Sequence, residues 1–382
     1  MLSRSLPFHG MGGMEVVAWE LSRELARIGQ AVTIITTGIP GNRGNFVQDG
    51  VTVVPMVGTP PRRYSTAWWS QSRRYFEQHC MESTNAVVSV SAAGFGLLSL
   101  KRKLPRVSFI MQAHGTSWGE VASKWRSRQL RSILGSARNL MWLPKDLLAY
   151  RQFDSVVAVG NRIYKDLTRP PASWALPAAR VRLINNGIDT NLFHPSLDGR
   201  QQARERLNID ERVPVVLSAS RLHVQKGVAH GIRVFARFLE KAPNAIYLIA
   251  GDGPERAALE ALARGLGVFA HVRFLGALDR SALAKFLQAA DVFLFLTDRV
   301  EGLPLNVLEA LASGLPTVIS DHLSISDTPG IIPVSPRDLL SCSKYLLNAL
   351  EGSGAARASL LPQQFTLAHS SEQYADLILS LK

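Results

Sequence analysis

Cysteine is scarce in this chain. Only two of its 382 residues are cysteines, Cys80 and Cys342, and their separation matches no spacing typical of a metal site or a redox pair. A disulfide-rich scaffold and a cysteine-bound metal are therefore excluded. We expect both residues to be structural thiols and the protein to reside in a reducing cytoplasm.

Long hydrophobic runs are also absent. No stretch approaches the roughly 18 apolar residues that a membrane-spanning helix needs, and the first residues, with Pro7, His9 and several glycines, do not form the apolar part of a secretory signal. The length exceeds what one hydrophobic core usually serves, so we expect two domains. Only Met1–Leu6 precede Pro7, which leaves room for a short first strand; a start assigned too late would account for that.

The first half of the chain has few acidic residues. Residues 1–185 carry 24 Lys and Arg but 10 Asp and Glu, whereas the remaining residues carry 19 and 20. Basic residues mixed with tryptophan suit the headgroup region of an anionic membrane, so we expect peripheral docking on the inner face of the cytoplasmic membrane and no nucleic-acid partner. A solvated basic face without a partner is the alternative. The residues concerned are Trp118, Trp125, Trp142, Lys101–Lys103, Arg106, Lys124, Arg126, Arg128, Arg131 and Arg138.

Short apolar runs alternate with helical patterns almost throughout the chain. Such alternation is typical of parallel, doubly wound sheets, and there is one on each side of Asn185–Asp189. We therefore predict an α/β fold of two Rossmann-like domains, residues 1–185 and 186–369. The predicted strands are Ala31–Thr37, Val51–Val57, Ala86–Val90, Val107–Met111, Ser155–Val159, Pro214–Ala219, Ala245–Ala250, Val272–Leu275, Asp291–Leu296 and Pro316–Ile319.

An acidic corner lies between the predicted strand Asp291–Leu296 and a predicted short helix, Leu305–Ser313. Glu301 precedes the Gly-Leu-Pro corner, and Glu309 lies inside the helix. Unpaired N–H groups at the start of a helix attract phosphate. Such a site can hold a sugar with one carboxylate, a diphosphate with backbone amides and a ribose diol with the other carboxylate. The alternative is two ordinary helix charges. The corner residues are Gly302, Leu303 and Pro304.

Two cations lie on a loop after another predicted strand. Arg221 and Lys226 follow Pro214–Ala219, five positions apart. Positive charges at the carboxyl end of a strand can neutralise a departing diphosphate, which is electrostatic catalysis of the leaving group. The chain has no Asp-x-Asp cluster that could hold a metal ion, so we expect neither a metal nor a cofactor. The alternative is a pair of surface cations.

Two further groups of candidate site residues lie in the first half of the chain. Gly12 and Gly13 follow the short first strand and open the first helix, where glycines let the backbone approach a ligand closely. His114 follows the predicted strand Val107–Met111 and is flanked by glycine, a position that would face a cleft. A turn of ordinary geometry and a non-catalytic histidine are the alternatives.

These segments, in this order, resemble the GT4 family of retaining glycosyltransferases, which have the GT-B fold of two Rossmann-like domains facing each other across a cleft. The resemblance covers nearly the whole chain and is strongest between Asn185 and Asp321. The chain departs from the family pattern in its short first strand and in the loops of the first domain. The matching segments are Asn186–Asp189 with Phe193 and Pro195, Ser220–Gly227, Ala250–Arg256, and the E-x7-E pair Glu301 and Glu309.

The resemblance implies a reaction. A hexosyl group would pass, with retention, from a nucleotide-diphospho sugar in the second domain to a hydroxyl of a glycan or lipid-linked acceptor in the first, in cell-surface polysaccharide or glycolipid synthesis. Glu301 would contact the donor sugar, Glu309 the ribose and His114 the sugar, with Gly12 and Gly13 near phosphate. A C-terminal helix at 370–382 would pack back on the first domain. We favour UDP over GDP.

Two other functions remain open. A sugar-nucleotide epimerase or a phosphorylase would share the architecture; a phosphorylase would need a pyridoxal-binding lysine and a longer chain, and an epimerase would not need the basic first domain. A non-catalytic, membrane-docked protein that binds sugar nucleotides is the other possibility. The complete set of charged candidates argues against this last function.

Overall fold

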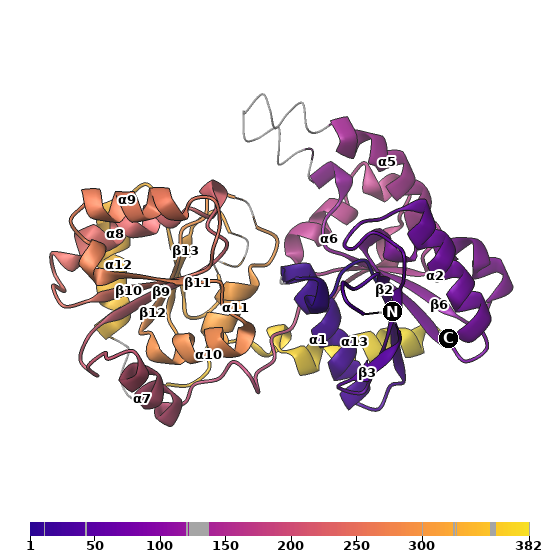
Figure 1. Ribbon diagram of the computed structural model, residues 1–382. Helices are drawn as coiled ribbons and strands as arrows, with labels where there is room; N and C mark the ends of the chain where they lie inside the picture. Colours follow the sequence, from indigo (N-terminus) through magenta and orange to yellow (C-terminus); the bar gives the residue numbers. More distant parts are fainter. Residues whose placement is uncertain are drawn as a thin grey trace. The chain divides into compact units, whose positions relative to one another are not determined.

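The computed structural model describes residues 1–10, 12–42, 44–119, 121, 137–299, 301–323, 325, 327–351 and 357–381. The chain divides into two compact units (Figure 1). Unit 1 comprises Met1–Gly187 and Leu367–Lys382, and unit 2 comprises Ile188–Thr366. Each unit has its own sheet, and the boundaries expected from the sequence lie within a few residues of these divisions.

Unit 1 is built on an eight-stranded sheet in the order β3-β4-β2-β1-β5-β6-β7-β8. Among the described strands every neighbouring pair is parallel except β3–β4, which is antiparallel. The strands are β1 (Leu2–Ser3), β2 (Val32–Thr37), β3 (Phe46–Gln48), β4 (Val51–Met56), β5 (Ala86–Val90), β6 (Ser108–Ala113), β7 (Ser155–Ala158) and β8 (Val181–Leu183).

The β3–β4 hairpin adds one antiparallel pair to an otherwise parallel sheet. Asp49 and Gly50 form its two-residue turn with φ angles of 50° and 78°. An Asp-Gly pair is favoured in such turns because both central residues need positive φ. The strand β1 is short, as the sequence predicts, yet it is central: Leu2 is buried and pairs with Ile35 on one side and Ser89 on the other.

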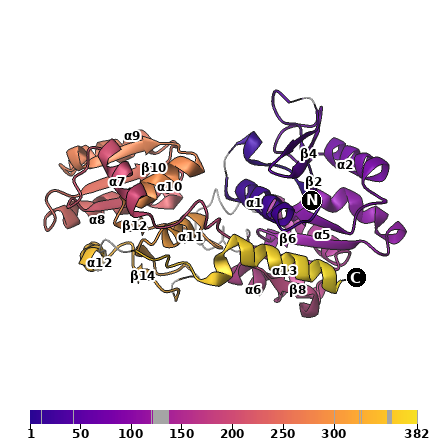
Figure 2. The ribbon, with the colours of Figure 1, turned by 90° about the horizontal axis from the view of Figure 1, so that it is seen from below.

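Helices flank this sheet. The C-terminal helix α13 packs against α1, and Figure 2 shows the two helices side by side. Tyr374 and Leu377 of α13 join Leu21 and Leu25 of α1 in a buried cluster against the sheet. The described α-helices of unit 1 are α1 (Gly13–Arg27), α2 (Thr66–His79), α5 (Ala137–Tyr150), α6 (Asn161–Leu167) and α13 (Leu367–Ser380), and the 3-10 helices are Pro7–His9, Ser91–Lys103, Ala172–Trp174 and Ala178–Arg180.

Unit 2 has a six-stranded parallel sheet in the order β11-β10-β9-β12-β13-β14. The strands are β9 (Val215–Ala219), β10 (Ile246–Ala250), β11 (Val272–Gly276), β12 (Val292–Phe295), β13 (Thr317–Ser320) and β14 (Ile331–Val334). All ten strands predicted from the sequence are present in the two sheets, with ends shifted by at most two residues. The strands β3, β8 and β14 were not predicted.

Two helical layers cover the sheet of unit 2 (Figure 1). Alternate residues of a strand point to opposite faces, so Leu217 of β9 packs with α10 and α11 while Val216 packs with α8, α9 and α12. The helices are α7 (Leu197–Arg206), α8 (Val228–Leu239), α9 (Arg256–Gly265), α10 (Arg280–Ala289), α11 (Leu305–Ala312) and α12 (Leu339–Glu351), with 3-10 helices at Val224–Lys226, Phe269–His271 and Gln363–Phe365.

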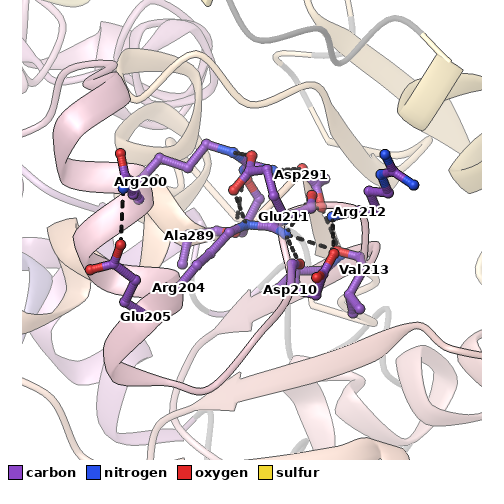
Figure 3. Close-up of polar contacts among 12 residues, drawn as sticks. Arg200, Arg204, Glu205, Asp210, Glu211, Arg212, Val213, Ala289 and Asp291 are labelled. Atoms are coloured by element: carbon purple, nitrogen blue, oxygen red, sulfur yellow. Dashed lines mark hydrogen bonds and ion pairs between the residues drawn. The ribbon is translucent and has the colours of Figure 1, made fainter.

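A buried ion network holds the amino end of β12 (Figure 3). Asp291 is 5% exposed and lies 2.7 Å from Arg204, 2.9 Å from Arg200 and 2.7 Å from Arg357. It also accepts the backbone N–H of Val215 at 2.8 Å. A buried carboxylate needs such pairing because an unpaired charge is costly in the interior. The network thus ties α7 and the segment after α12 to the sheet.

Candidate functional site

The predicted site residues of unit 2 gather at one edge of its sheet. All strands there are parallel, so the loops after β9 and β12 leave from the same edge. The structure brings two of the residues into contact: Lys226 Nζ lies 2.8 Å from Glu301 Oε1. Their side chains are 22% and 17% exposed. A ligand at this edge would therefore meet a preformed pair of opposite charges.

Backbone geometry fixes the Lys226 side of this pair. Lys226 ends the 3-10 turn Val224–Lys226, and Gly227 follows with a φ of 63°. A Cβ atom on Gly227 would lie 1.8 Å from the carbonyl oxygen of Leu296, so only glycine fits there. The carboxyl ends of β9 and β12 are thereby held in close approach.

Arg221 lies on the same loop but is exposed and forms no ion pair within the described ranges. The Gly-Asp-Gly segment after β10 supports this loop. Cβ atoms on Gly251 and Gly253 would lie 1.9 Å from the carbonyl oxygen of Ser220 and 2.3 Å from that of Leu222. The segment resembling the family at Ala250–Arg256 thus has a structural role, because it backs the loop that presents Arg221.

The Gly-Leu-Pro corner leads directly into α11. Pro304 is the N-cap residue of α11, without a side-chain cap, so the first amides of the helix and its dipole point to this edge. Asn306 Nδ2 donates to the carbonyl oxygen of Ala219 at 2.7 Å, which ties the helix start to the end of β9. Leu303 packs on the hydrophobic core of unit 2. This arrangement suits an anion such as a phosphate.

Glu309 lies inside α11 with a partner that the sequence did not predict. Its carboxylate is buried, and Arg280 Nη1 donates to Oε1 at 2.7 Å. The Arg280 guanidinium in turn lies 4.8 Å from the ring centroid of Phe193, which is fully buried. Arg280 is the first residue of α10, where a cation opposes the helix dipole. That unfavourable position is the one sequence signal that could have indicated a carboxylate partner.

His114 belongs to unit 1 and follows β6. Its Nε2 lies 2.9 Å from Gln112 Oε1, and Gln112 Nε2 donates to the Tyr374 hydroxyl at 2.9 Å. An amide oxygen can only accept, so Nε2 of His114 carries the proton and Nδ1 remains an acceptor. Burial, together with the charge of Arg4, lowers the pKa of His114 to about 4. The imidazole is therefore neutral at physiological pH.

Gly12 and Gly13 lie at the start of α1 in unit 1. Gly12 is the N-cap residue and Gly13 the first helical residue. A Cβ atom on Gly12 would lie 2.4 Å from Glu15 Oε2, so the loop passes close to a buried carboxylate. Arg62 lies 4.0 Å from the other oxygen of Glu15. The predicted phosphate-proximal loop therefore has an acidic residue in its first turn.

Two family models match the chain, one in each unit. The model described as "Glycosyltransferase Family 4" matches residues 11–192, and the model described as "Glycosyl transferases group 1" matches residues 199–328. Together they cover most of the chain. The chain belongs to the GT4-type glycosyltransferases. The first model includes Gly12, Gly13 and His114, and the second includes the charged residues from Arg221 to Glu309.

Curated relatives match parts of this glycosyltransferase. A GDP-mannose-dependent alpha-(1-6)-phosphatidylinositol monomannoside mannosyltransferase of Mycolicibacterium smegmatis is 35% identical over 148 residues, which are 37% of this chain and 38% of that protein. The match thus spans well under half the length of that relative. An N-acetyl-alpha-D-glucosaminyl L-malate synthase of Bacillus anthracis is 24% identical over 81% of this chain and 76% of its own length.

Solved structures share the whole fold. Sucrose-phosphate synthase from Thermosynechococcus elongatus has a TM-score of 0.72 and 19% identity, and the match covers 97% of this chain and 94% of that one. Anabaena HepE in complex with UDP-glucose has a TM-score of 0.72 and 16% identity over 99% and 98%. These neighbours are GT-B glycosyltransferases. The predicted GT-B class of this chain, two α/β units with parallel sheets, is confirmed.

The basic segment of this glycosyltransferase is only partly described. Trp142 lies within α5, next to Trp69 at 6.4 Å between ring centroids and to Lys145 at 4.7 Å. Within the described ranges, no helix is long and apolar enough to span a membrane. The same residues contain no group of three or more His, Cys, Asp or Glu side chains that could hold a metal ion. Lys124, Trp125, Arg126, Arg128 and Arg131, named above as candidates for membrane docking, lie outside the described residues.

Proposed function

We propose that this chain transfers a hexosyl group, with retention of anomeric configuration, from a nucleotide-diphospho sugar to an acceptor hydroxyl. Unit 2 binds the donor and unit 1 binds the acceptor. The observation that carries this proposal is the arrangement at the edge of unit 2, where Lys226 contacts Glu301 and α11 begins beside the end of β9, the strand that leads into the loop bearing Arg221. The relatives support a sugar donor, because their names describe GDP-mannose-dependent and UDP-glucose-bound proteins.

The leaving group determines which residues contribute most to catalysis. Negative charge develops on the departing phosphate oxygen, so Arg221, Lys226 and the first amides of α11 stabilise the transition state more than the ground state. The amides of α11 are fixed before the donor arrives, so this part of the site needs no reorganisation during the reaction. The two cations and these amides need no metal ion, and we propose a reaction without metal or cofactor.

Donor binding exchanges the partners of the Lys226–Glu301 pair. A diphosphate carries more charge than a carboxylate and would draw Lys226 Nζ away from Glu301. The released Glu301 can then accept hydrogen bonds from the donor sugar. Glu309 accepts from the ribose diol while Arg280 holds its other side. His114, neutral and with an accepting Nδ1, contacts the hexosyl group in this proposal, and Gly12 and Gly13 lie near the phosphates.

The acceptor is a hydroxyl of a glycan or a lipid-linked sugar. The relatives' names include a phosphatidylinositol mannoside, malate and a sugar phosphate as acceptors or products, and we propose a role in cell-surface polysaccharide or glycolipid synthesis. Unit 1 has the excess of basic side chains that attraction to an acidic acceptor or an anionic membrane surface requires. We favour UDP over GDP as the nucleotide.

A screen of nucleotide sugars tests this function. UDP-, GDP- and ADP-linked hexoses are compared by thermal stabilisation, since a ligand at a hundred times its Kd adds about 2.7 kcal/mol. Donors that stabilise are then incubated with glycan and lipid extracts, and products are identified by mass spectrometry and NMR. A transferred hexose that keeps the anomeric configuration of the donor supports the proposal. Epimerised nucleotide sugar without transfer, or binding without turnover, contradicts it in favour of an epimerase or a binding protein.

A further inference from the structure

Arg4 lies at the topological switch point of unit 1. It directly follows β1, which pairs with β2 on one side and β5 on the other. The chain continues from β1 to β2 in one direction and later crosses to β5 in the other. Open α/β sheets bind their ligands outside the carboxyl ends of the strands at such a reversal. The first side chain beyond β1 is therefore placed where a ligand of unit 1 is expected.

The guanidinium of Arg4 has no anionic partner within the described ranges. It lies 5.1 Å from the ring centroid of Tyr64, in a cation–π contact that fixes its orientation. Its Nε is buried without a hydrogen-bond acceptor, and the hydroxyl of the adjacent Ser5, which is 1% exposed, also has no partner. The neighbouring carboxylate, Glu15, lies 4.0 Å from Arg62 instead.

A second arginine in the same chain shows what a purely structural role looks like. Arg204 in unit 2 is almost fully buried, and its Nη2 lies 2.7 Å from Asp291. Its Nε and Nη1 donate to four backbone carbonyl oxygens. A buried cation is normally compensated in this way, because removal from water without a partner is costly. Arg4 is only partly buried, but its Nε is buried and lacks such a partner.

We propose that Arg4 binds an oxyanion, a phosphate or a carboxylate, carried by the acceptor. The planar guanidinium can form two parallel hydrogen bonds with either group. The anion would balance the positive charge that the described residues leave unpaired. The anion site rests on unit 1 alone; only its assignment to the acceptor rests on the proposed function.

His114 provides a direct readout of this site. The charge of Arg4 contributes to the low pKa of His114, so an anion bound to Arg4 should raise that pKa. NMR of the imidazole is followed while inorganic phosphate is titrated into the full chain. Phosphate should shift the His114 signals in a saturable manner. In Arg4→Gln the apparent affinity should fall roughly tenfold or more, since a charged hydrogen bond is lost.

Matched variants separate this site from general charge effects. Arg63→Gln removes an exposed cation of the same unit and should leave the response unchanged. Arg4→Lys keeps the charge without the planar fork; it should bind with intermediate affinity and serves if Arg4→Gln does not fold. Arg221→Ala removes a second phosphate-binding candidate in unit 2 and should also leave the His114 response intact. An unresponsive His114 in the wild type, or an equal response in Arg4→Gln, would overturn the proposal.

The source of the oxyanion is tested with two further probes. Hexose 6-phosphate is compared with free hexose, and vesicles of phosphatidylglycerol are compared with vesicles of phosphatidylcholine. A response to the sugar phosphate alone supports a soluble acceptor, and a response to phosphatidylglycerol supports a lipid headgroup. Phosphate binding without any glycosyl transfer would contradict the proposed function but retain the site. Transfer to a phosphate-bearing acceptor at the wild-type rate in Arg4→Gln would contradict the acceptor role and retain the transferase.

Discussion

Replacing Glu309 by glutamine should weaken the binding of UDP while preserving the fold. The amide oxygen of glutamine can still accept from Arg280 Nη1, which lies 2.7 Å from Oε1, and the side-chain volume is nearly unchanged. The substitution therefore removes only the negative charge from a carboxylate whose side chain is 6% exposed. At so little exposure, screening by water is weak, and the charge contributes strongly to hydrogen bonds with the ribose diol.

The expected magnitude follows from that hydrogen bonding. A hydrogen bond to a charged group contributes about 1.5–3 kcal/mol, and about 1.4 kcal/mol corresponds to a tenfold change in Kd. Glu309→Gln should therefore bind UDP roughly ten- to 150-fold more weakly than the wild type. Arg280→Ala should weaken binding in the same direction, because the Glu309 carboxylate loses its orienting partner.

Calorimetric titration measures the effect. The wild type and Glu309→Gln are titrated with UDP and with a 2′,3′-dideoxy analogue, which lacks the diol and should bind both proteins with similar affinity. Glu260→Gln, on the surface of α9, is the matched control, because its ion pairs with Arg256 and Arg264 are partly exposed and contribute little. Glu301→Gln should affect transfer more than UDP binding. Wild-type affinity of Glu309→Gln for UDP, or an equal loss for the dideoxy analogue, would refute the ribose assignment.

Four other results are expected. Arg221→Ala and Lys226→Ala should each lower kcat by roughly 10²-fold or more in steady-state assays of folded protein, because each removes a cation from the leaving diphosphate; near wild-type turnover would contradict this. Activity should persist in excess EDTA, and a loss restored by Mg²⁺ or Mn²⁺ would count against the metal-free mechanism. Asp291→Ala should lower the free energy of unfolding of unit 2 by about 3–5 kcal/mol in urea denaturation, because Arg204 stays buried without its carboxylate partner. A loss below about 1 kcal/mol would show that the network is dispensable. The pKa of His114 is about 4 in the folded protein, below its ordinary value of 6.5. The folded state therefore binds fewer protons between these values, and the stability that His114 contributes above pH 6.5 is lost as the pH falls towards 4. His114→Gln should lose less stability across that pH range.

The sequence by itself determined the fold class and the edge on which the candidate site lies. Buried parallel strands appear in the sequence as apolar, β-branched runs, and ten of them were predicted in this way, whereas β3, β8 and β14 were not. The carboxyl ends of parallel strands share one edge, so the placement of Arg221 and Glu301 after two such strands was predictable. The Asp49-Gly50 pair is a hairpin signal present in the sequence, although β3 itself was not among the predicted strands.

Only the tertiary structure decided which side chains pair. Lys226 meets Glu301, Arg280 meets Glu309, and Gln112 reaches Tyr374 across 262 positions of the chain. Such contacts depend on how helices pack on the sheet and on side-chain rotamers, and no periodicity in the sequence reports either of these.

The same holds for the partner that is missing. That Arg4 lacks a carboxylate within the described ranges is a property of the space around it, not of its neighbours in sequence. A strand period of two residues and a helix period of 3.6 say which face a residue occupies. Which charges on facing surfaces come within hydrogen-bonding distance is set by packing between segments far apart in the chain, and therefore only by the fold.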